Sequence, residues 1–346
     1  MKKHLFITVA ALMWLALTNG MSVAKDSYPH KKQIAKHPEA LAIVEAREMK
    51  FLIDPAKVGT NPEKGLNKIW ERVKKFAKKE GVNVEEKGFA HDGFTYSTKV
   101  YYDTAKGEIS KKGYVVRITT KYIGGKPATA ALTVKFIDRD HPERVFSAME
   151  DDEDASVEEN VGPAKGYTLD TYLEKATKMD VDLNKVPVTM ADFSALIPHL
   201  ETLGISPKAK LTGIGAYSIR MKPGFVHLPG MPFPATISME AWLPVDGESK
   251  EAFVYDFSYG FPTGDYYDMA ATHSYAESMM QKLYKQLDKE MGLPSNAKWR
   301  GSKASYLRQG VKPAKYSGKM KASELRFYKE PAKNPDGTVT FNDDPS

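Results

Sequence analysis

Short runs in which polar and apolar residues alternate are the feature that most constrains the fold of this 346-residue chain. They occupy residues 47–54, 101–104, 115–119 and 132–136. Successive side chains of a β-strand point to opposite faces, so each run would place its charged residues on one face and its apolar residues on the other. The pattern predicts antiparallel strands that are apolar on one side and charged on the other.

The charged faces of these runs are rich in cations. They carry Glu48 and Lys50, then Arg117, then Lys135. On a common concave surface these side chains would form a basic pocket for an anion. Any half-buried antiparallel sheet also has one solvated polar face, and the same residues would suit it. The runs alone leave both interpretations open.

The order of the expected elements predicts an α+β fold. Asn61-Pro62 is typical of a helix start, and apolar residues then recur at helical spacing as far as Gly81. The other expected elements are strands within 40–54, 82–149, 210–221, 235–243 and 252–261, helices within 170–203 and 268–291, and an exposed acidic connection over 150–159. Strands and helices do not alternate regularly, which favours an antiparallel sheet with helices around it over a doubly wound fold.

The first 24 residues have the pattern of a signal peptide. Lys2 and Lys3 precede an apolar stretch at 5–17, and residues 22–24 supply a small-x-small cleavage site. A retained membrane anchor is the alternative, and the shortness of the apolar stretch counts against it. We therefore expect an exported protein, periplasmic or secreted, without a stable membrane anchor after cleavage.

The rest of the chain is expected to hold one β-rich domain at 40–310, with a helical insert at about 166–206. A flexible lead-in at 25–39 would precede it, and a weakly ordered tail at 311–346 would follow it.

Composition narrows the chemistry. The chain has no cysteine, which excludes disulfides, thiolate metal sites and thiol nucleophiles. Its formal net charge of +6 is mild and comes without arginine-rich tracts, so nucleic acid is not an expected partner. The chain also lacks the glycine-rich nucleotide loops, the GxSxG motif and the HExxH motif, which removes the common signature chemistries.

Several segments, taken in their order along the chain, resemble the CYTH or triphosphate tunnel superfamily. The matching segments are Glu48–Leu52 (the family's ExExK strand running into Phe-Leu), Tyr102–Thr104 followed by Arg117 (YYDT…LRIR), Leu132–Lys135 (LTxK), Ser218–Arg220 (a later arginine strand) and Ser302–Tyr306 (SKY). The resemblance reaches from about Glu45 to Tyr306, and the ordering of the segments carries more weight than any one of them.

The resemblance implies a closed or nearly closed antiparallel β-barrel of about eight strands with flanking helices, wide enough to enclose a lumen. It implies that a phosphorylated or polyanionic small molecule is bound by Lys50, Arg117, Lys135, Arg220 and Lys303. It also implies that magnesium or manganese is bound by Glu48, Glu240 and Asp256. Metal-dependent hydrolysis of a triphosphate or another phosphate would be the reaction, with no catalytic residue identified.

The chain departs from the family pattern at three places. Ala46 stands where the first acid of ExExK is expected, and Thr119 stands where the second arginine of LRIR is expected. The late strand that carries paired glutamates in the family offers only Asp256 here. Fewer carboxylates bind a divalent metal more weakly, so anion binding is favoured over catalysis. The alternative is a non-catalytic periplasmic or envelope protein whose barrel serves binding or interaction.

Overall fold

A computed structural model describes residues 44–87, 93–163, 169–228, 234–245, 250–262, 270–294, 303, 307, 332–333 and 339–340. The expected signal peptide at 1–24 and the expected lead-in at 25–39 lie outside the described residues, as does most of the tail at 311–346. None of the helices in the described part of the chain combines the length and apolarity needed to cross a membrane.

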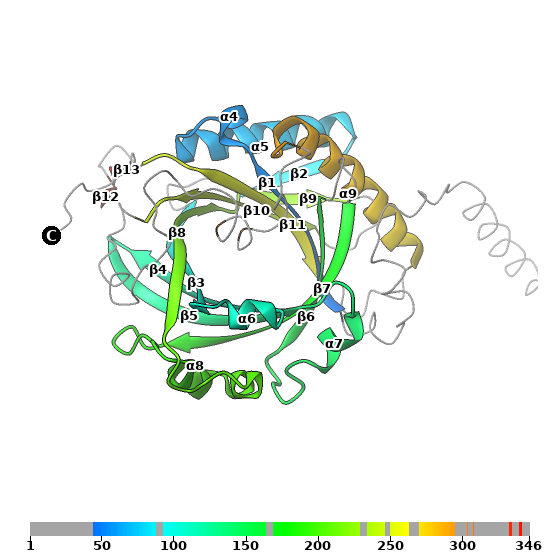
Figure 1. The fold of residues 1–346 in the computed structure, drawn as a ribbon. Coiled ribbons are helices and arrows are strands. Elements are labelled where there is room, and N and C mark those ends of the chain that lie inside the picture. Colours follow the sequence, from blue (N-terminus) through cyan, green and yellow to red (C-terminus); the bar gives the residue numbers. More distant parts are fainter. Residues whose placement is uncertain are drawn as a thin grey trace, which may run out of the picture.

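Nine strands of the described chain form a closed barrel, seen nearly end-on in Figure 1. They are β1 (Val44–Ile53), β3 (Phe94–Thr104), β4 (Tyr114–Ile123), β5 (Lys126–Ile137), β6 (Ser156–Pro163), β7 (Leu169–Val181), β8 (Leu211–Met221), β10 (Ala235–Leu243) and β11 (Val254–Pro262). Their order around the ring is β11-β1-β6-β7-β5-β4-β3-β8-β10, and the pairing of β10 with β11 closes it. The predicted closed barrel is confirmed.

The barrel is antiparallel except between β1 and β6, which pair in parallel. Strand directions can alternate all the way round only when the number of strands is even. With nine strands, at least one neighbouring pair must be parallel. The prediction of about eight antiparallel strands therefore differs from the structure by one strand and one parallel pair.

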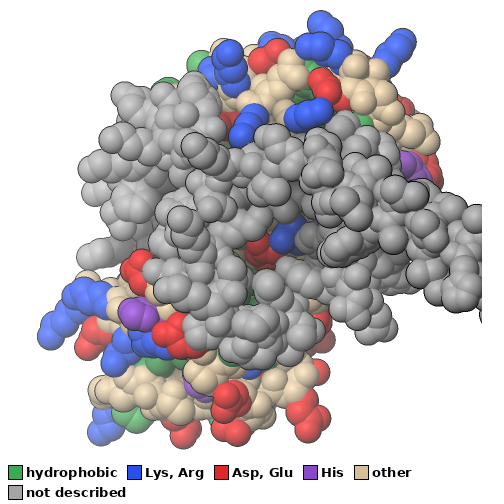
Figure 2. All heavy atoms as spheres, turned by 90° about the vertical axis from the view of Figure 1, so that its right-hand side faces the viewer, with side chains coloured by type: hydrophobic (Ala, Val, Ile, Leu, Met, Phe, Trp, Pro, Cys, Tyr) green, Lys and Arg blue, Asp and Glu red, His purple; other side chains and the backbone are tan. Residues whose placement is uncertain are grey.

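Helices cover two sides of the barrel (Figure 1). On one side lie α4 (Pro55–Val58), α5 (Pro62–Lys79) and α9 (Ala270–Met291); on the other lie α7 (Pro142–Ser147), α8 (Met190–Leu196) and the 3-10 helix η2 (Pro198–Leu203). Smaller elements are α6 (Glu108–Lys111), the added strands β2 (Asn83–Glu86) and β9 (Gly224–His227), and the separate pair β12 (Ala332–Lys333) and β13 (Val339–Thr340). In Figure 2 the described residues at the top of the view carry mainly Lys and Arg side chains, and those at the bottom carry more Asp and Glu.

The apolar faces of the strands point outward, into cores beneath these helices. One core joins α5 and α9 to β1, β10 and β11, and a second joins α8 and η2 to β3, β4 and β5. The first is tightly fitted at Gly65 of α5, where an added Cβ would lie 2.1 Å from the Tyr255 hydroxyl oxygen. That hydroxyl donates to backbone carbonyls just before α5, at Gly59 (2.8 Å) and Asn61 (2.9 Å). With most apolar residues outside, much of the inner face is left to polar and charged ones.

Two segments differ from their predictions. Residues 169–181, expected in a helical insert at about 166–206, form the strand β7, and helix is found only later, in α8 and η2. The end of the acidic connection expected at 150–159 lies in β6. Leu, Glu, Lys and Ala in β7 favour a helix by propensity, but pairing with β5 on one side and β6 on the other overrides that preference.

Candidate anion-binding lumen

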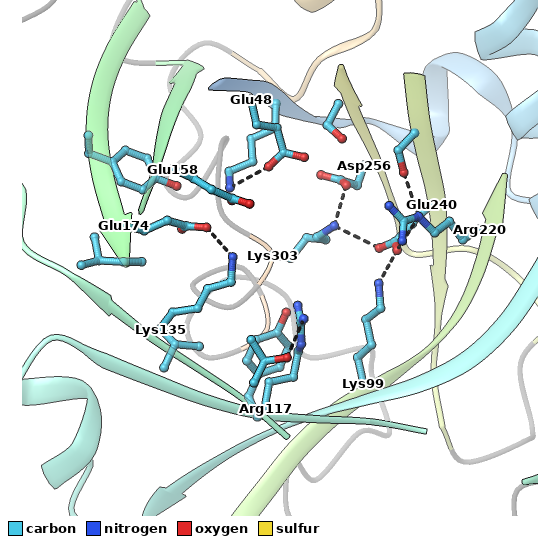
Figure 3. Close-up of a pocket in the computed structure, with 18 residues that line it drawn as sticks. Glu48, Lys99, Arg117, Lys135, Glu158, Glu174, Arg220, Glu240, Asp256 and Lys303 are labelled. Atoms are coloured by element: carbon cyan, nitrogen blue, oxygen red, sulfur yellow. Dashed lines mark hydrogen bonds and ion pairs between the residues drawn. The ribbon is translucent and has the colours of Figure 1, made fainter. Parts of the chain in front are cut away.

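The structure brings all eight predicted site residues to one cavity of about 300 Å³ inside the barrel (Figure 3). They are Lys50, Arg117, Lys135, Arg220 and Lys303 together with Glu48, Glu240 and Asp256. They come from β1, β4, β5, β8, β10 and β11, and Lys303 comes from the chain beyond α9. The charged faces therefore line a lumen, which rules out the solvated outer face as their location. The roles of these residues as ligands stay predictions.

Other polar groups of the lumen were not predicted from the sequence. They are Lys99 and Tyr101 of β3, Glu158 of β6, Tyr172 and Glu174 of β7, and the hydroxyls of Thr133, Ser238 and Ser258. Lys99 lies two residues before Tyr101 in the alternating stretch of β3, a signal that could have identified it. The two glutamates were missed because their segments were expected to be a connection and a helix.

An apolar cluster fills the barrel interior beside the cavity. Leu52 and Trp242 each lie two residues beyond a lumen residue of their strand, and they pack with Leu293 and Leu307, which follow the end of α9. The cluster occupies inward positions that would otherwise extend the polar lumen. The cluster shares Tyr101 and Val115 with the cavity lining, so apolar packing borders the cavity, and Lys303 lies four residues before Leu307 in the chain.

Most cations of the lumen are paired with carboxylates. Lys50 Nζ lies 3.2 Å from Glu48 Oε2, and Lys135 contacts Glu174. Burial opposes ionisation of Glu174, but Lys135 and Lys50 lower its pKa to about 2. These pairs keep the buried charges compensated.

The carboxylate of Glu240 lies close to three cationic side chains, whereas an ordinary ion pair has one. Lys99 contacts one carboxylate oxygen, Lys303 Nζ lies 3.0 Å from the other, and Arg220 Nε lies 3.7 Å away. Trp242 Nε1 also donates to it at 3.1 Å. Burial opposes ionisation of Glu240, but the neighbouring Lys303 and Lys99 hold its pKa well below the usual range.

Arg117 is different. Its terminal NH2 group donates a long hydrogen bond of 3.4 Å to Thr133 Oγ1, and its Nε is buried without a hydrogen-bond partner among the described residues. The same part of the chain gives it no carboxylate partner. A buried guanidinium nitrogen without an acceptor is costly, by about 1–3 kcal/mol. An anion in the lumen would supply the missing acceptor.

The charges of the lining nearly balance, with six Lys or Arg side chains facing five Asp or Glu side chains. Two of these groups titrate near neutral pH. Burial raises the pKa of Glu158 to about 6, although Lys135 opposes the shift. Burial lowers the pKa of Lys99 to about 7, although Glu240 opposes that shift. A bound anion would favour the protonated form of both groups.

Glu158 also bears on the acid that is missing at Ala46. The parallel pairing of β1 with β6 places Ala46 beside Glu158, and the Glu158 side chain lines the cavity. A carboxylate from β6 therefore lies next to the position where the sequence of β1 lacks one.

The predicted metal ligands are only partly brought together. Glu240 and Asp256 are register partners on β10 and β11, and Lys303 Nζ bridges them, 2.5 Å from Asp256 Oδ2. Glu48 is paired with Lys50 instead. Among the described residues, no three His, Cys, Asp or Glu side chains are grouped closely enough to hold a metal. Two carboxylates that hold one cation between them do suit a hard divalent ion in their donor chemistry.

The chain was compared with protein families, with curated proteins and with solved structures. No protein-family model matches the chain, and no curated protein matches it. The similar solved structures include a candidate adenylyl cyclase from Hippeastrum with a dominant triphosphatase activity, at 10% identity and a TM-score of 0.39, covering 79% of this chain and 100% of that one. They also include a candidate adenylate cyclase from Bacillus halodurans, at 12% identity and a TM-score of 0.34, covering 69% and 89%.

The closed barrel itself, established by its strand pairing, is the architecture that the resemblance to the CYTH superfamily implied.

Proposed function

We propose that the lumen binds a phosphorylated or other polyanionic small molecule together with a divalent metal ion. The observation that carries the proposal is Arg117, whose guanidinium faces a lysine-lined cavity without a carboxylate partner among the described residues. Guanidinium groups grip phosphate oxygens through paired hydrogen bonds, so a phosphate chain supplies what this side chain lacks.

The anion would be held by Arg117, Lys50, Lys135 and Arg220, which reach the cavity from four different strands. A cavity of about 300 Å³ is at the small end of ligand sites, which favours a compact anion such as a short polyphosphate over a large ligand.

Glu240 and Asp256 are the residues of choice for a magnesium or manganese ion, because they already share one cation. When bound, such an ion would neutralise phosphate charge and lower the pKa of a bound water. Metal-dependent hydrolysis of the bound phosphate is therefore the second part of the proposal. The alternative is a barrel that binds its ligand without turning it over.

One experiment separates these functions. The purified chain is incubated with tripolyphosphate and MgCl2 or MnCl2, and both phosphate release and ligand binding are measured, the latter by calorimetry. Binding with release supports both parts, and binding without release leaves the non-catalytic barrel. Absence of binding, or equal binding by an Arg117→Ala variant, would contradict the lumen as the site.

We also propose that the chain acts outside the cytoplasm, as a periplasmic or secreted protein. The support is the charged, apolar and small-residue pattern of residues 1–24. Mass spectrometry of protein from the native host should find an N-terminus at Lys25, and an intact residue 1–24 segment on the mature protein would contradict export by cleavage.

A further inference from the structure

We infer that Lys303 is a built-in counter-ion that a divalent metal must displace from Glu240 and Asp256, and that the displaced ammonium then binds the anion. Metal and anion would accordingly bind the lumen cooperatively, through this one side chain. The inference rests on the proposed function and concerns the regulation of the same site.

The first step is the geometry of the bridge. Lys303 Nζ lies 2.5 Å from Asp256 Oδ2 and 3.0 Å from Glu240 Oε2, and these carboxylates belong to register partners on adjacent strands. The Lys303 side chain is 20% exposed, whereas the side chains of Glu240 and Asp256 are 3% and 7% exposed. Among the described lumen residues, Lys303 is the cation that bridges carboxylates of two strands through such short contacts.

The second step is competition. Two carboxylates held together in a buried place repel each other, and a cation between them relieves the repulsion. The effect is visible in the acids, because burial and the Glu240 charge leave the pKa of Asp256 raised even beside Lys303. A divalent ion prefers these same oxygens and brings two charges where the ammonium brings one. The metal and Lys303 cannot both occupy them.

The third step is the fate of the displaced ammonium. Lys303 Nζ lies 5.6 Å from the centre of the Trp242 ring, in a lumen that already holds Lys99 and Arg117. An ammonium released there without an acceptor would be a buried, uncompensated charge, which is strongly unfavourable. A phosphate oxygen in the cavity would compensate it. The metal alone therefore binds weakly, because it leaves the Lys303 ammonium without an acceptor. The anion alone also binds weakly, because Lys303 still contacts Glu240 and Asp256. When both bind, the carboxylates hold the metal and Lys303 contacts the anion.

The test measures binding rather than turnover. MnCl2 and tripolyphosphate are titrated separately and together into the full chain, its Lys303→Met variant and a Lys74→Met control. Lys74 bridges Glu71 (2.7 Å) and Glu86 (2.6 Å), so it repeats the two-carboxylate arrangement outside the lumen. We expect Lys303→Met to bind Mn²⁺ alone at least tenfold tighter than the unmodified chain. We expect tripolyphosphate to strengthen Mn²⁺ binding in the unmodified chain and in Lys74→Met, and to do so less in Lys303→Met.

Stability gives an independent readout. Without metal, Lys303→Met leaves two carboxylates without their counter-ion, so its melting temperature should fall and should recover on addition of Mn²⁺. If the Lys303→Met variant does not fold, the same measurements are made on Lys303→Gln, which keeps a hydrogen-bond donor.

The outcomes are separable. If the unmodified chain binds Mn²⁺ with tripolyphosphate and removal of the Lys303 charge leaves Mn²⁺ affinity unchanged or lower, the counter-ion role is overturned and the proposed function stands. If no variant binds either species, both are overturned. Asp256→Asn added to Lys303→Met should remove the gain in Mn²⁺ affinity, and a gain that survives would place the metal elsewhere and overturn the inference.

Discussion

The two faces of β1 carry charges that are arranged in different ways. On the outer face, Arg47 and Glu159 form an ion pair with Nε–Oε2 and NH2–Oε2 distances of 2.7 and 2.5 Å, and each side chain is 8% exposed. Thr171 Oγ1 donates to the other Glu159 oxygen at 2.8 Å. On the inner face, Glu48 and Lys50 belong to a lumen in which several cations share one carboxylate and Arg117 has none among the described residues.

This difference indicates what each face is for. The outer charges are joined by short contacts, and removal of one partner from such a buried pair is strongly destabilising. In the inner cluster several cations share Glu240, and Arg117 has no carboxylate partner among the described residues. A bound anion would supply the acceptor that Arg117 lacks. Removing an outer charge should therefore change stability, whereas removing an inner charge should change binding.

The largest effect is expected for Glu159→Gln. The change removes the charge that the buried Arg47 contacts at 2.7 and 2.5 Å, which should lower the free energy of unfolding by about 3–5 kcal/mol. Urea denaturation followed by circular dichroism measures it. Tripolyphosphate affinity should be unchanged under conditions where the variant is folded. A loss of affinity at unchanged stability would place this pair in the binding site instead.

Arg117→Ala should show the opposite behaviour. Loss of charge-assisted hydrogen bonds worth about 1.5–3 kcal/mol should weaken tripolyphosphate binding roughly ten- to a hundredfold. The free energy of unfolding should stay the same or rise, because the change also removes a buried nitrogen that has no hydrogen-bond partner among the described residues. Calorimetry measures the first and urea denaturation the second. Arg117→Lys, which keeps the charge but not the paired donors, should lie between. Lower stability with normal binding would make Arg117 a structural residue.

The pH dependence of binding is expected to be of intermediate size. Raising the pH ionises Glu158, whose pKa is about 6, and then removes the charge of Lys99, whose pKa is about 7. Both changes make the lumen less positive, so tripolyphosphate affinity should fall by roughly tenfold as the pH rises through this range. Because tripolyphosphate also titrates, the test compares the unmodified chain with Lys99→Met between pH 5.5 and 8.5. The two profiles should differ around pH 7. Identical profiles would show that the charge of Lys99 does not contribute to the pH dependence of binding.

The smallest effect is expected for Lys74→Met on the outer surface. Although Lys74 contacts two carboxylates, the pair is solvent-exposed, so the free energy of unfolding should change by less than about 1 kcal/mol. If urea denaturation showed that the free energy of unfolding falls by more than 3 kcal/mol, solvent exposure would not explain the difference between the Lys74 contacts and the buried Arg47–Glu159 pair.

Much of the fold could be predicted because alternation and helix signals are local. Strand β10 was expected at 235–243 and is observed there, and the helix expected after Asn61 begins at Pro62. The parallel pairing of β1 with β6 could not be predicted, because it joins segments more than a hundred residues apart and leaves no local signal. Strand β7 was hidden by residues that favour helices, and its identity is set by its two neighbours.

The site residues could likewise be predicted where the sequence signal is local, and not where it depends on distant strands. Lys50 and Arg117 belong to clearly alternating runs, so their common face could be predicted. Glu158 and Glu174 belong to segments whose strand character depends on partners distant in the sequence, so their place in the lumen could not. The ordered resemblance, rather than any single run, made the inward-facing interpretation stronger than the solvated one.

The central claim is that the inward-facing charges form the binding site of a small polyanion. Its most direct test is calorimetric titration of tripolyphosphate with MnCl2 into the full chain and its Arg117→Ala variant. The account predicts one site per chain and a binding constant at least tenfold weaker in the variant. Equal affinities, or no binding to the unmodified chain, would contradict it.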